Sequence, residues 1–274
     1  MTTEIQASII KKLEIIQDFD VAKEARKRID FLKNYLRSTG LKSYVLGISG
    51  GVDSATAGLL AQKAVNELRD EGYDCEFVAV RIPYGTQKDE AEAAEVIRFI
   101  SPDDIYKIDI KPATDAMMNA FAENYTSLSQ YTNAHCDFNK GNVKARMRMV
   151  SQYLIAGFDK GLVIGTDHGA EAVMGFYTKF GDGAADILPL SGLNKRRVRA
   201  IAEFMGLPSH LVQKTPTADL EDNRPQLPDE EAHGVSYEQI DDFLEGKDIG
   251  KEAHDIIVAA YTKTEHKRNL PVTP

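Results

Sequence analysis

Apolar residues recur along this chain with two different spacings. Positions three or four residues apart, as at Met147, Val150, Leu154 and Phe158, are typical of helices, whereas unbroken β-branched and apolar runs such as 43–48 are typical of strands buried on both faces. Met147, Met149 and Phe158 are expected to lie in the core. Helices are predicted at about residues 3–16, 21–37, 53–69, 142–159, 194–205, 236–245 and 251–263, with another starting near Asp89. Strands are predicted at about residues 43–48, 76–82, 105–110 and 162–166.

The alternation of these strands with helices predicts an α/β fold. Connections from one strand through a crossover helix to the next are right-handed, so we expect a doubly wound, mostly parallel sheet with helices on both faces, a Rossmann-like architecture. Ligands of such sheets bind at the carboxyl ends of the strands. The one long stretch without either spacing, 214–234, carries three prolines and many acidic residues and is predicted to be a loop.

The composition of the 274-residue chain excludes several classes of protein. Its 43% hydrophobic and 27% charged residues are ordinary for a globular protein, and no apolar run reaches the roughly 18 residues that span a bilayer. The first residues are amphipathic and lack the apolar core of a secretory signal, so we expect a cytoplasmic protein. Cys75 and Cys136 are too few for a disulfide framework and lack the paired spacing of a zinc site.

The charge distribution narrows the choice of ligand. A net charge of −9 makes a general electrostatic attraction to nucleic acid unfavourable. Basic residues gather instead in three short islands, 140–148, 194–199 and 265–268, and this pattern suits small anionic ligands better than a polymer. Solvated helix faces are the alternative explanation for these islands.

The segment Gly47–Ser54, G-I-S-G-G-V-D-S, follows the first predicted strand and carries the most specific signal. Gly50 and Gly51 can adopt positive φ, so consecutive backbone N–H groups can turn toward a phosphate at the start of the next helix. The two serines add hydroxyl donors, and Asp53 adds a carboxylate suited to Mg²⁺. The segment is neither a Walker A loop nor the dinucleotide-binding G-x-G-x-x-G. A glycine-rich turn without a ligand is the alternative.

The string S-G-G-x-D-S resembles the pyrophosphatase loop of the ATP-pyrophosphatase (adenine nucleotide α-hydrolase-like) superfamily, whose members activate a carboxyl or carbonyl oxygen by adenylation. Further segments narrow the resemblance to the ammonia-dependent NAD⁺ synthetase family. They follow in order as 81–90 (R-I-P-Y-G-T-Q-K-D-E), 137–146 (D-F-N-K-G-N-V-K-A-R), 165–186 (beginning G-T-D-H-G-A-E), 193–197 (L-N-K-R-R), 216–220 (P-T-A-D-L) and 264–268 (T-E-H-K-R).

The resemblance implies a ligase that converts deamido-NAD⁺, ATP and ammonia to NAD⁺, AMP and pyrophosphate, the last step of NAD biosynthesis. A nicotinate carboxylate is a poor electrophile, so ATP first converts it to an acyl-adenylate and pyrophosphate leaves. Ammonia then attacks the carbonyl and AMP departs. Each step places negative charge on phosphate oxygens, so positioning, metal ions and cationic side chains are expected to carry the catalysis.

The resemblance also implies roles for individual residues. Asp53 and Glu171 would hold Mg²⁺ and Lys195 would neutralise the ATP phosphates, which makes these three the expected catalytic residues. His168 stays without a role, because no second histidine lies near it in sequence and Mg²⁺ prefers oxygen ligands. The expected ATP-binding residues are Gly47, Ile48, Ser49, Gly50, Gly51, Val52, Asp53, Ser54, Arg81, Gln87, Thr166, Lys195 and Thr217. Those expected to bind deamido-NAD⁺ are Arg146, Lys179, Asp186, His266 and Lys267.

By the same resemblance the protein would be a homodimer with the deamido-NAD⁺ site partly at the subunit interface, and the helices before the first strand are plausible interface material. We expect one NAD synthetase domain over 1–274, with an N-terminal helical segment over about 1–40. A glutaminase domain would need on the order of 200 further residues, so free ammonia is the expected nitrogen donor. The loops 83–88 and 214–234 are expected to close over the site as lids.

Two other kinds of function remain open from the residues alone. Another adenylating amidotransferase or a tRNA-modifying member of the superfamily would share the loop, although a tRNA enzyme should show a basic face. A nucleotide-sensing module would hold ATP without turnover. Two carboxylates suited to a metal and a lysine favour turnover, because a sensor need not stabilise departing pyrophosphate.

Overall fold

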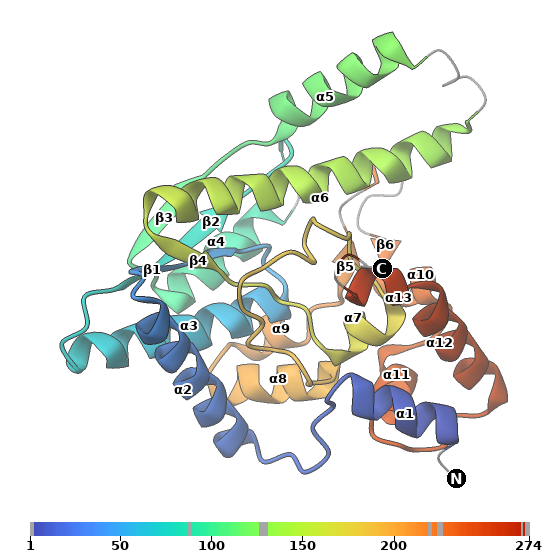
Figure 1. The fold of residues 1–274 in the computed structure, drawn as a ribbon, viewed down its shortest axis with the longest axis horizontal. Helices are drawn as coiled ribbons and strands as arrows, with labels where there is room; N and C mark the ends of the chain where they lie inside the picture. The colour runs from blue at the N-terminus through green and yellow to red at the C-terminus, as the bar shows by residue number, and fades with distance from the viewer. Residues whose placement is uncertain are drawn as a thin grey trace.

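The computed structural model describes residues 3–86, 89–125, 131–218, 221–223, 227–269 and 271, so Gln87, expected to bind ATP, lies outside the described residues. Within them a central sheet has four parallel strands in the order β3-β2-β1-β4 (Figure 1), which confirms the predicted α/β fold. No described helix is both long and apolar enough to cross a bilayer. The strands are β1 (Ser43–Gly47), β2 (Glu76–Arg81), β3 (Asp104–Lys107) and β4 (Gly161–Val163).

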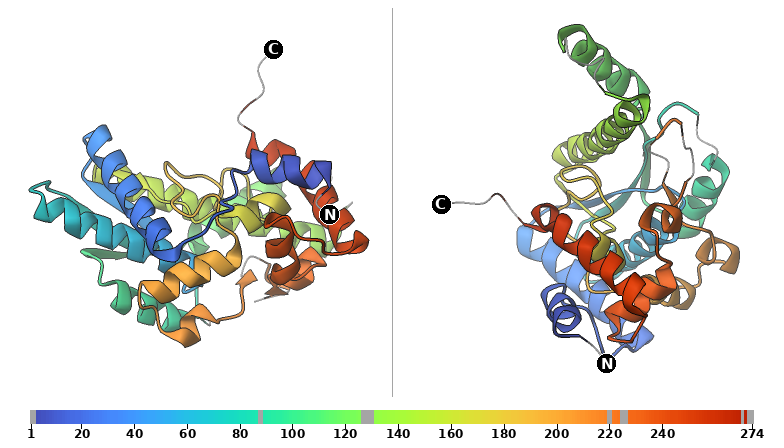
Figure 2. Two further views of the ribbon diagram at one scale, coloured as in Figure 1. Left: turned by 90° about the horizontal axis from the view of Figure 1, so that it is seen from below. Right: turned by 90° about the vertical axis from the view of Figure 1, so that its right-hand side faces the viewer.

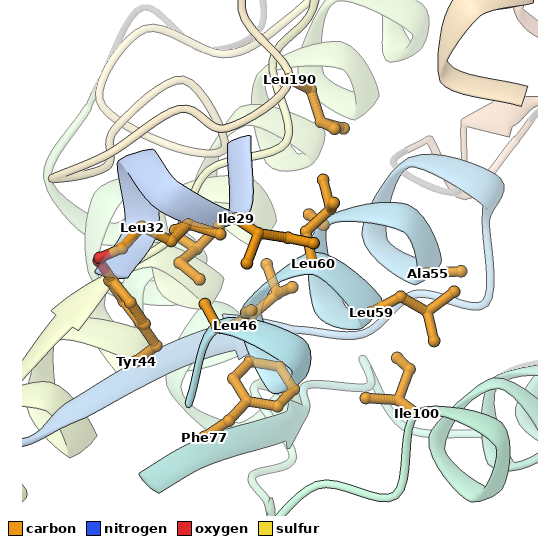
Figure 3. Packing of buried hydrophobic residues seen from close by; sticks show 14 of the residues in the cluster. Ile29, Leu32, Tyr44, Leu46, Ala55, Leu59, Leu60, Phe77, Ile100 and Leu190 are labelled. Atoms are coloured by element: carbon orange, nitrogen blue, oxygen red, sulfur yellow. The ribbon is translucent and has the colours of Figure 1, made fainter. Parts of the chain in front are cut away.

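Helices cover both faces of this sheet, as the sequence predicts. Tyr44 and Leu46 of β1 pack on one side against helical residues such as Leu32 and Leu60 (Figure 3). Val45, which alternates with them, belongs to a separate apolar cluster on the other side. The first side is covered by α2 (Val21–Thr39), α3 (Val52–Asp70), α4 (Glu90–Ile100) and α8 (Lys195–Phe204), and the second by α6 (Asn133–Phe158).

The strand order places a crevice at the carboxyl ends of β1 and β4. From β1 the chain adds β2 and then β3 on one side, and later returns to add β4 on the other side. The segments that leave β1 and β4 therefore diverge, and this is where doubly wound sheets bind ligands. Gly47–Ser54 leaves β1 and Thr166 follows β4, so both parts of the expected ATP site lie at this point.

A second group of helices packs beside the sheet around its own apolar cluster, which includes Ile9, Val173, Ile240, Phe243 and Ile257. It joins the N-terminal helix to helices near the C-terminus, which lie together in both views of Figure 2. The group contains α1 (Glu4–Lys12), α7 (Gly169–Met174), α11 (Tyr237–Leu244) and α12 (Lys251–Lys263), and α10 (Asp229–His233) and α13 (Glu265–Arg268) lie next to it along the chain.

Some element boundaries differ from the prediction. β3 ends at Lys107 rather than at Ile110, because it is an exposed edge strand and the following residues keep only isolated hydrogen bonds to Arg81 at the end of β2 and to Pro83 after it. α6 starts at Asn133, well before the predicted start at 142, where Thr132 caps the helix by accepting the N–H of His135. The prediction also lacks several of the helices in the structure, among them α5 (Lys111–Asn124), α9 (Ser209–Val212) and α13.

The stretch 214–234, predicted to be a loop, contains regular structure. Thr217–Ala218 (β5) pairs antiparallel with Leu227–Pro228 (β6), and α10 follows directly. Pro228 precedes α10, and three acidic residues occupy its first turn, where the helix dipole favours them. The prediction of an entirely irregular stretch is therefore wrong, because elements this short leave no periodic signal.

The apolar stripe that predicts α6 does not face the core. Phe158 is 81% exposed, so its predicted place in the core is wrong, and Leu154 on the same stripe is 56% exposed. Met147 is partly buried. The side of α6 that packs on the sheet carries Ile155 and Ala156. Helical periodicity thus identified a face of the helix without showing what covers it.

Candidate active site

The segment after β1 is a tight loop held by its own two serines. Ser49 Oγ lies 3.2 Å from Ser54 Oγ and accepts the Gly51 N–H at 3.2 Å. Ser54 Oγ donates in turn to the Gly51 carbonyl at 3.1 Å. Gly50 has a φ of +88°, a conformation that residues with a Cβ rarely adopt. The loop therefore needs a glycine at position 50, as the sequence predicts.

The start of α3 is suited to binding an anion. Gly51 is its N-cap residue, and no side-chain cap satisfies the N–H groups of the first turn. These groups and the helix dipole favour negative charge. Gln152 holds the loop by accepting the Gly47 N–H at 2.7 Å, and Arg81 holds it by donating to the Ile48 carbonyl. Arg81, expected to bind ATP, thus supports the loop backbone.

Charged groups from three distant segments meet beside this loop. The Lys195 ammonium lies 3.0 and 2.7 Å from the two carboxylate oxygens of Asp53. Glu171 lies in the first turn of α7, and its Oε2 is 3.7 Å from Nε2 of His168. The same nitrogen is 3.5 Å from Asp53 Oδ1. The three residues expected to be catalytic are thus in one cluster.

Burial and mutual charge set the ionisation of the cluster. Burial raises the pKa of Asp53, but the Lys195 ammonium outweighs this effect and holds the pKa below its ordinary value. Burial and the Asp53 carboxylate raise the pKa of Glu171 well above its usual range. Burial lowers the pKa of Lys195, yet the two carboxylates raise it further. The cluster therefore holds an ion pair beside a carboxyl group that a further cation would ionise.

The residues present fit a bound cation. Carboxylate oxygens of Asp53 and Glu171 suit Mg²⁺, the ion expected from the sequence. Asp53, His168 and Glu171 each offer one ligand atom, and these atoms lie within 4.8 Å of one another. His168 is 1% exposed, and neither of its ring nitrogens has a hydrogen-bond partner among the described residues. A polar group buried without a partner is costly unless something binds it.

Residues that the sequence prediction omits hold Lys195 in place. Asp241 accepts the backbone N–H groups of Lys195 at 2.9 Å and Arg196 at 2.7 Å, the first two residues of α8. The ring of Tyr237 lies 4.9 Å from the Lys195 ammonium, and its hydroxyl donates to Asp229 at 2.9 Å. Tyr237 and Asp241 are one turn apart on α11, but nothing in the sequence links that helix to Lys195.

These groups line a cavity of about 740 Å³, a size typical of small-molecule sites. Its wall is formed by the carboxyl ends of the central strands, by α6 and α7, and by parts of 214–234. The structure thus brings most of the expected ATP-binding residues to one cavity. Those on its wall are Gly47, Ile48, Ser49, Gly51, Val52, Asp53, Ser54, Arg81, Thr166, Lys195 and Thr217.

Four of the residues expected to bind deamido-NAD⁺ lie together at one side of the cavity. Lys267 is on the cavity wall and donates to two backbone carbonyls of the segment after α7, at 2.8 and 2.7 Å. Lys179 donates to the His266 carbonyl at 2.6 Å, and Arg146 donates to the Lys179 carbonyl at 3.3 Å. The first and third basic islands of the sequence therefore meet here.

Asp186 lies apart from this group. Its carboxylate accepts the backbone N–H of Val163 in β4 at 2.7 Å, and its own N–H donates to the Val163 carbonyl at 2.9 Å. The residue is exposed and is not on the cavity wall. The structure does not bring Asp186 to the other expected residues, and its role in binding stays a prediction.

Two further acidic residues belong to the site region and escape the sequence prediction. Burial, with the neighbouring Asp182, raises the pKa of Asp167 to about 7. Burial also raises the pKa of Asp182, which lines the cavity and accepts the Thr178 N–H at 3.1 Å. Asp167, with a pKa near neutral, is therefore a candidate for proton transfer. Asp167 and Asp182 both lie in the segment 165–186, and its resemblance to the family was the one sequence signal that could have pointed to them.

Comparison with known proteins identifies the family. Residues 24–271 match the sequence model of the NAD synthase family. The chain belongs to the NAD synthase family. It is 56% identical to an NH₃-dependent NAD⁺ synthetase from Paraburkholderia phytofirmans, over 98% of this chain and 93% of the relative. The crystal structure of NAD⁺ synthetase from Burkholderia pseudomallei has a TM-score of 0.83 and 52% identity, covering 97% and 96% of the two chains.

Another solved structure with a similar fold is named for a different activity. The NMN synthetase from Francisella tularensis is 34% identical, with a TM-score of 0.81, over 94% of this chain and 99% of that chain. Membership of the NAD synthase family confirms the resemblance inferred from the sequence segments. It sets aside the alternatives of a tRNA-modifying enzyme and of a nucleotide sensor.

Proposed function

We propose that the cavity at the carboxyl ends of β1 and β4 catalyses the ATP-dependent amidation of deamido-NAD⁺ by ammonia. The products are NAD⁺, AMP and pyrophosphate, and the reaction is the carbon–nitrogen ligation that ends NAD biosynthesis. The observation that supports this site is the contact of Lys195 with Asp53 directly beside the loop 49–54. That loop offers amides and hydroxyls to phosphates, and the cluster offers charge to a departing pyrophosphate.

In the first step, an oxygen of the nicotinate carboxylate attacks the α-phosphorus of ATP, and the bond to the bridging oxygen of the β-phosphate breaks. The amides at the start of α3 and the hydroxyls of Ser49 and Ser54 hold the phosphates. Lys195 turns from Asp53 to the oxygens of the departing pyrophosphate. When bound by Asp53 and Glu171, Mg²⁺ supplies further positive charge to these oxygens.

In the second step, ammonia adds to the carbonyl carbon and the bond to the AMP oxygen breaks. Ammonium must first lose one proton, and the amide nitrogen loses another as the product forms. Asp167, with its pKa of about 7, and Asp182 on the cavity wall are the groups we assign to these transfers.

The basic group formed by Arg146, Lys179, His266 and Lys267 is proposed to bind deamido-NAD⁺. The pyrophosphate of this substrate is anionic, and burial lowers the pKa of Lys267, so an arriving phosphate would favour its charged form. The backbone carbonyls that these side chains now contact fix their positions beside the cavity. When a phosphate binds, some of these hydrogen bonds to backbone carbonyls would be replaced by charge-assisted hydrogen bonds to phosphate oxygens.

We propose that 214–234 and the shorter loop after β2 act as lids that keep water from the acyl-adenylate. The longer lid is fastened to α6. Asp137 accepts the N–H groups of Asp222 and Asn223 at 2.8 Å each, and Lys144 pairs with Asp222 at 2.6 Å. These contacts hold the described part of the lid beside the cavity.

We propose that the protein is a homodimer whose second copy covers the outer faces of α5 and α6. These two helices lie along one edge of the molecule (Figure 1) and expose large apolar side chains. Arg146 lies on α6, so a partner here would approach the proposed deamido-NAD⁺ residues. α2 also exposes Phe31 and Tyr35, which leaves the helices before β1 as further interface material. The exposed apolar residues of α5 and α6 include Met117, Phe121, Phe138, Val150, Leu154 and Phe158.

We propose that the chain works as one NAD synthetase unit. Residues from Leu46 to Lys267 line a single cavity, so no part of that range can be separated from the site. Cys75 and Cys136 are free thiols, which supports a cytoplasmic location.

The proposed function is tested with purified protein, ATP, Mg²⁺, deamido-NAD⁺ and ammonium. NAD⁺ is followed with a coupled dehydrogenase and pyrophosphate is measured separately; one of each should form per turnover. Asp53→Asn should keep the fold and lose pyrophosphate release. Because a relative is an NMN synthetase, nicotinate mononucleotide is offered as a competing substrate. Absence of NAD⁺ at every ammonium concentration would refute the assignment, and preference for the mononucleotide would change the substrate.

A further inference from the structure

His168 is a fully buried side chain that the proposed mechanism does not use. It is the N-cap residue of α7, three residues before Glu171. Its Nε2 lies 3.5 Å from Asp53 Oδ1 and 3.7 Å from Glu171 Oε2, distances too long for good hydrogen bonds. Neither ring nitrogen has a hydrogen-bond partner among the described residues. A buried imidazole in this position therefore points to something that binds it.

The backbone that carries this ring is held firmly in place. The His168 carbonyl accepts the Ala172 N–H at 2.9 Å, and the Gly169 N–H donates to the Leu193 carbonyl at 2.6 Å. A Cβ on Gly169 would lie 2.8 Å from that carbonyl oxygen and 2.6 Å from Ile15 Cδ1. Position 169 thus admits only glycine, and the close contact holds His168 against the carboxylate pair.

The imidazole ring is also of a chemical kind that binds cations. A neutral imidazole has one nitrogen with a free lone pair, which is the form that ligates metals. The other two candidate ligands, Asp53 and Glu171, are carboxylates whose oxygens lie within 4.8 Å of the imidazole nitrogen and of each other.

We propose that His168 supplies Nε2 as a third protein ligand to the cation held by Asp53 and Glu171. This inference rests on the proposed cation site. It also predicts a preference, because Mg²⁺ favours oxygen ligands whereas Mn²⁺ and Co²⁺ accept an imidazole with two carboxylates. The site should therefore bind Mn²⁺ more tightly than Mg²⁺.

The cation and Lys195 compete for Asp53. The Lys195 ammonium now contacts both oxygens of that carboxylate. A divalent cation on His168, Asp53 and Glu171 takes over the charge of Asp53, and the ammonium becomes available to phosphate oxygens. His168 thereby links cation binding to the movement of the lysine.

Pulsed electron paramagnetic resonance of bound Mn²⁺ tests the inference directly. The full-length protein is loaded with Mn²⁺ and α,β-methylene ATP, whose α–β bond cannot be cleaved. One sample carries natural histidine and a second carries histidine labelled with ¹⁵N, so that nitrogen from histidine is distinguished from that of the adenine or of lysine. We expect electron spin-echo modulation from a ligated histidine nitrogen that changes with the label. Identical modulation in the two samples, with Mn²⁺ bound, overturns the inference.

Two substitutions give a second readout. His168→Gln places an oxygen near the position of Nε2, whereas the shorter side chain of His168→Asn does not reach it. We expect His168→Gln to lose the label-dependent modulation and to reduce the preference for Mn²⁺ over Mg²⁺ by about tenfold or more. Unchanged preference in folded His168→Gln counts against the role. Asp53→Asn separates the two proposals. Undiminished Mn²⁺ binding in that variant refutes the cation site itself. Loss of Mn²⁺ binding in the variant, together with no histidine signal in the wild type, refutes only the role of His168.

Discussion

Replacing Gly50 by alanine tests whether the loop 49–54 depends on the left-handed backbone conformation of Gly50. Gly50 has a φ of +88°, and a Cβ there would lie 3.0 Å from the backbone nitrogen of Ala93 and 3.1 Å from its Cα. Gly51 is a matched control, since its φ of −82° and ψ of 159° suit any residue. A Cβ on Gly51 would meet only Ser49 Oγ, at 3.4 Å. The two variants add the same methyl group at adjacent positions.

The expected effects differ in size. A left-handed backbone costs a residue with a Cβ about 1–2 kcal/mol, and contact with the backbone of α4 adds about 1 kcal/mol. Gly50→Ala should therefore lower the free energy of unfolding by about 2–3 kcal/mol, which lowers Tm by roughly 4–10 °C in a chain of this size. Gly51→Ala should change that free energy by less than about 1 kcal/mol, because alanine fits its backbone and restricts the unfolded chain.

Urea unfolding and calorimetry measure these effects. The chain has no tryptophan, so far-ultraviolet circular dichroism is the readout for unfolding. Calorimetric titration with ATP then tests whether the loop amides stay in the positions that bind phosphate. Gly50→Ala should weaken ATP binding about tenfold, or 1.4 kcal/mol, more than Gly51→Ala does. Equal losses of stability in the two variants would refute the argument, because they would show that the positive φ does not hold the loop.

Three further predictions follow from individual contacts. Lys195→Met leaves two carboxyl groups without their cation, so Mg²⁺ should raise its Tm more than that of the wild type; equal shifts would contradict the competition between ammonium and metal. Tyr237→Phe keeps the ring beside the ammonium and loses only the bond to Asp229. Tyr237→Leu loses both the ring contact with Lys195 and the hydrogen bond to Asp229, and it should lower kcat about tenfold more than Tyr237→Phe does. KM for ATP is measured as the control. Glu67 hydrogen-bonds Arg26, which lowers its pKa to about 2 from 4.5. The stability that ionised Glu67 gives to the folded protein is present above pH 4.5 and is lost as the pH falls toward 2. Glu67→Gln should therefore lower the free energy of unfolding by about 1 kcal/mol at pH 7 and hardly at all at pH 2, as measured by urea unfolding.

Buried strands were the most predictable part of the fold. The run 43–48 is apolar on both faces because helices cover both faces of β1, and its observed range is almost the predicted one. The edge strand β3 has no such cover, so its boundaries were misplaced. α6 shows the opposite error: its stripe of Leu154 and Phe158 has the period of a core helix, yet it is exposed. Periodicity reports that a face is apolar, while burial depends on which element lies opposite.

The number of basic residues in the islands overstates the charge available to a substrate, because several of these residues pair with acids of the protein. In the second island, Lys195 enters the site, whereas Arg196 pairs with Asp242 and Glu245. In the first, Lys144 pairs with Asp222 of the stretch 214–234. Many cations of each island are thus used to hold the structure together. The acidic residues that pair with these cations lie far along the chain. No local sequence pattern could therefore show which cation stays available to a substrate.

The position of Lys195 shows why the site could be predicted only in part. The lysine itself lies in a recognisable segment, but two residues of α11 determine where its ammonium lies. Asp241 accepts the first two N–H groups of α8 and so fixes the start of that helix, while Tyr237 lies against the ammonium. Burial raises the pKa of Asp241 to about 6, so its ionised form is costly and is retained only because those amides need an acceptor. In the sequence Asp241 is one acid among many on an amphipathic helix. Its role arises only when the second group of helices packs against α8, and the position of the Lys195 ammonium therefore depends on the packing of that group against α8.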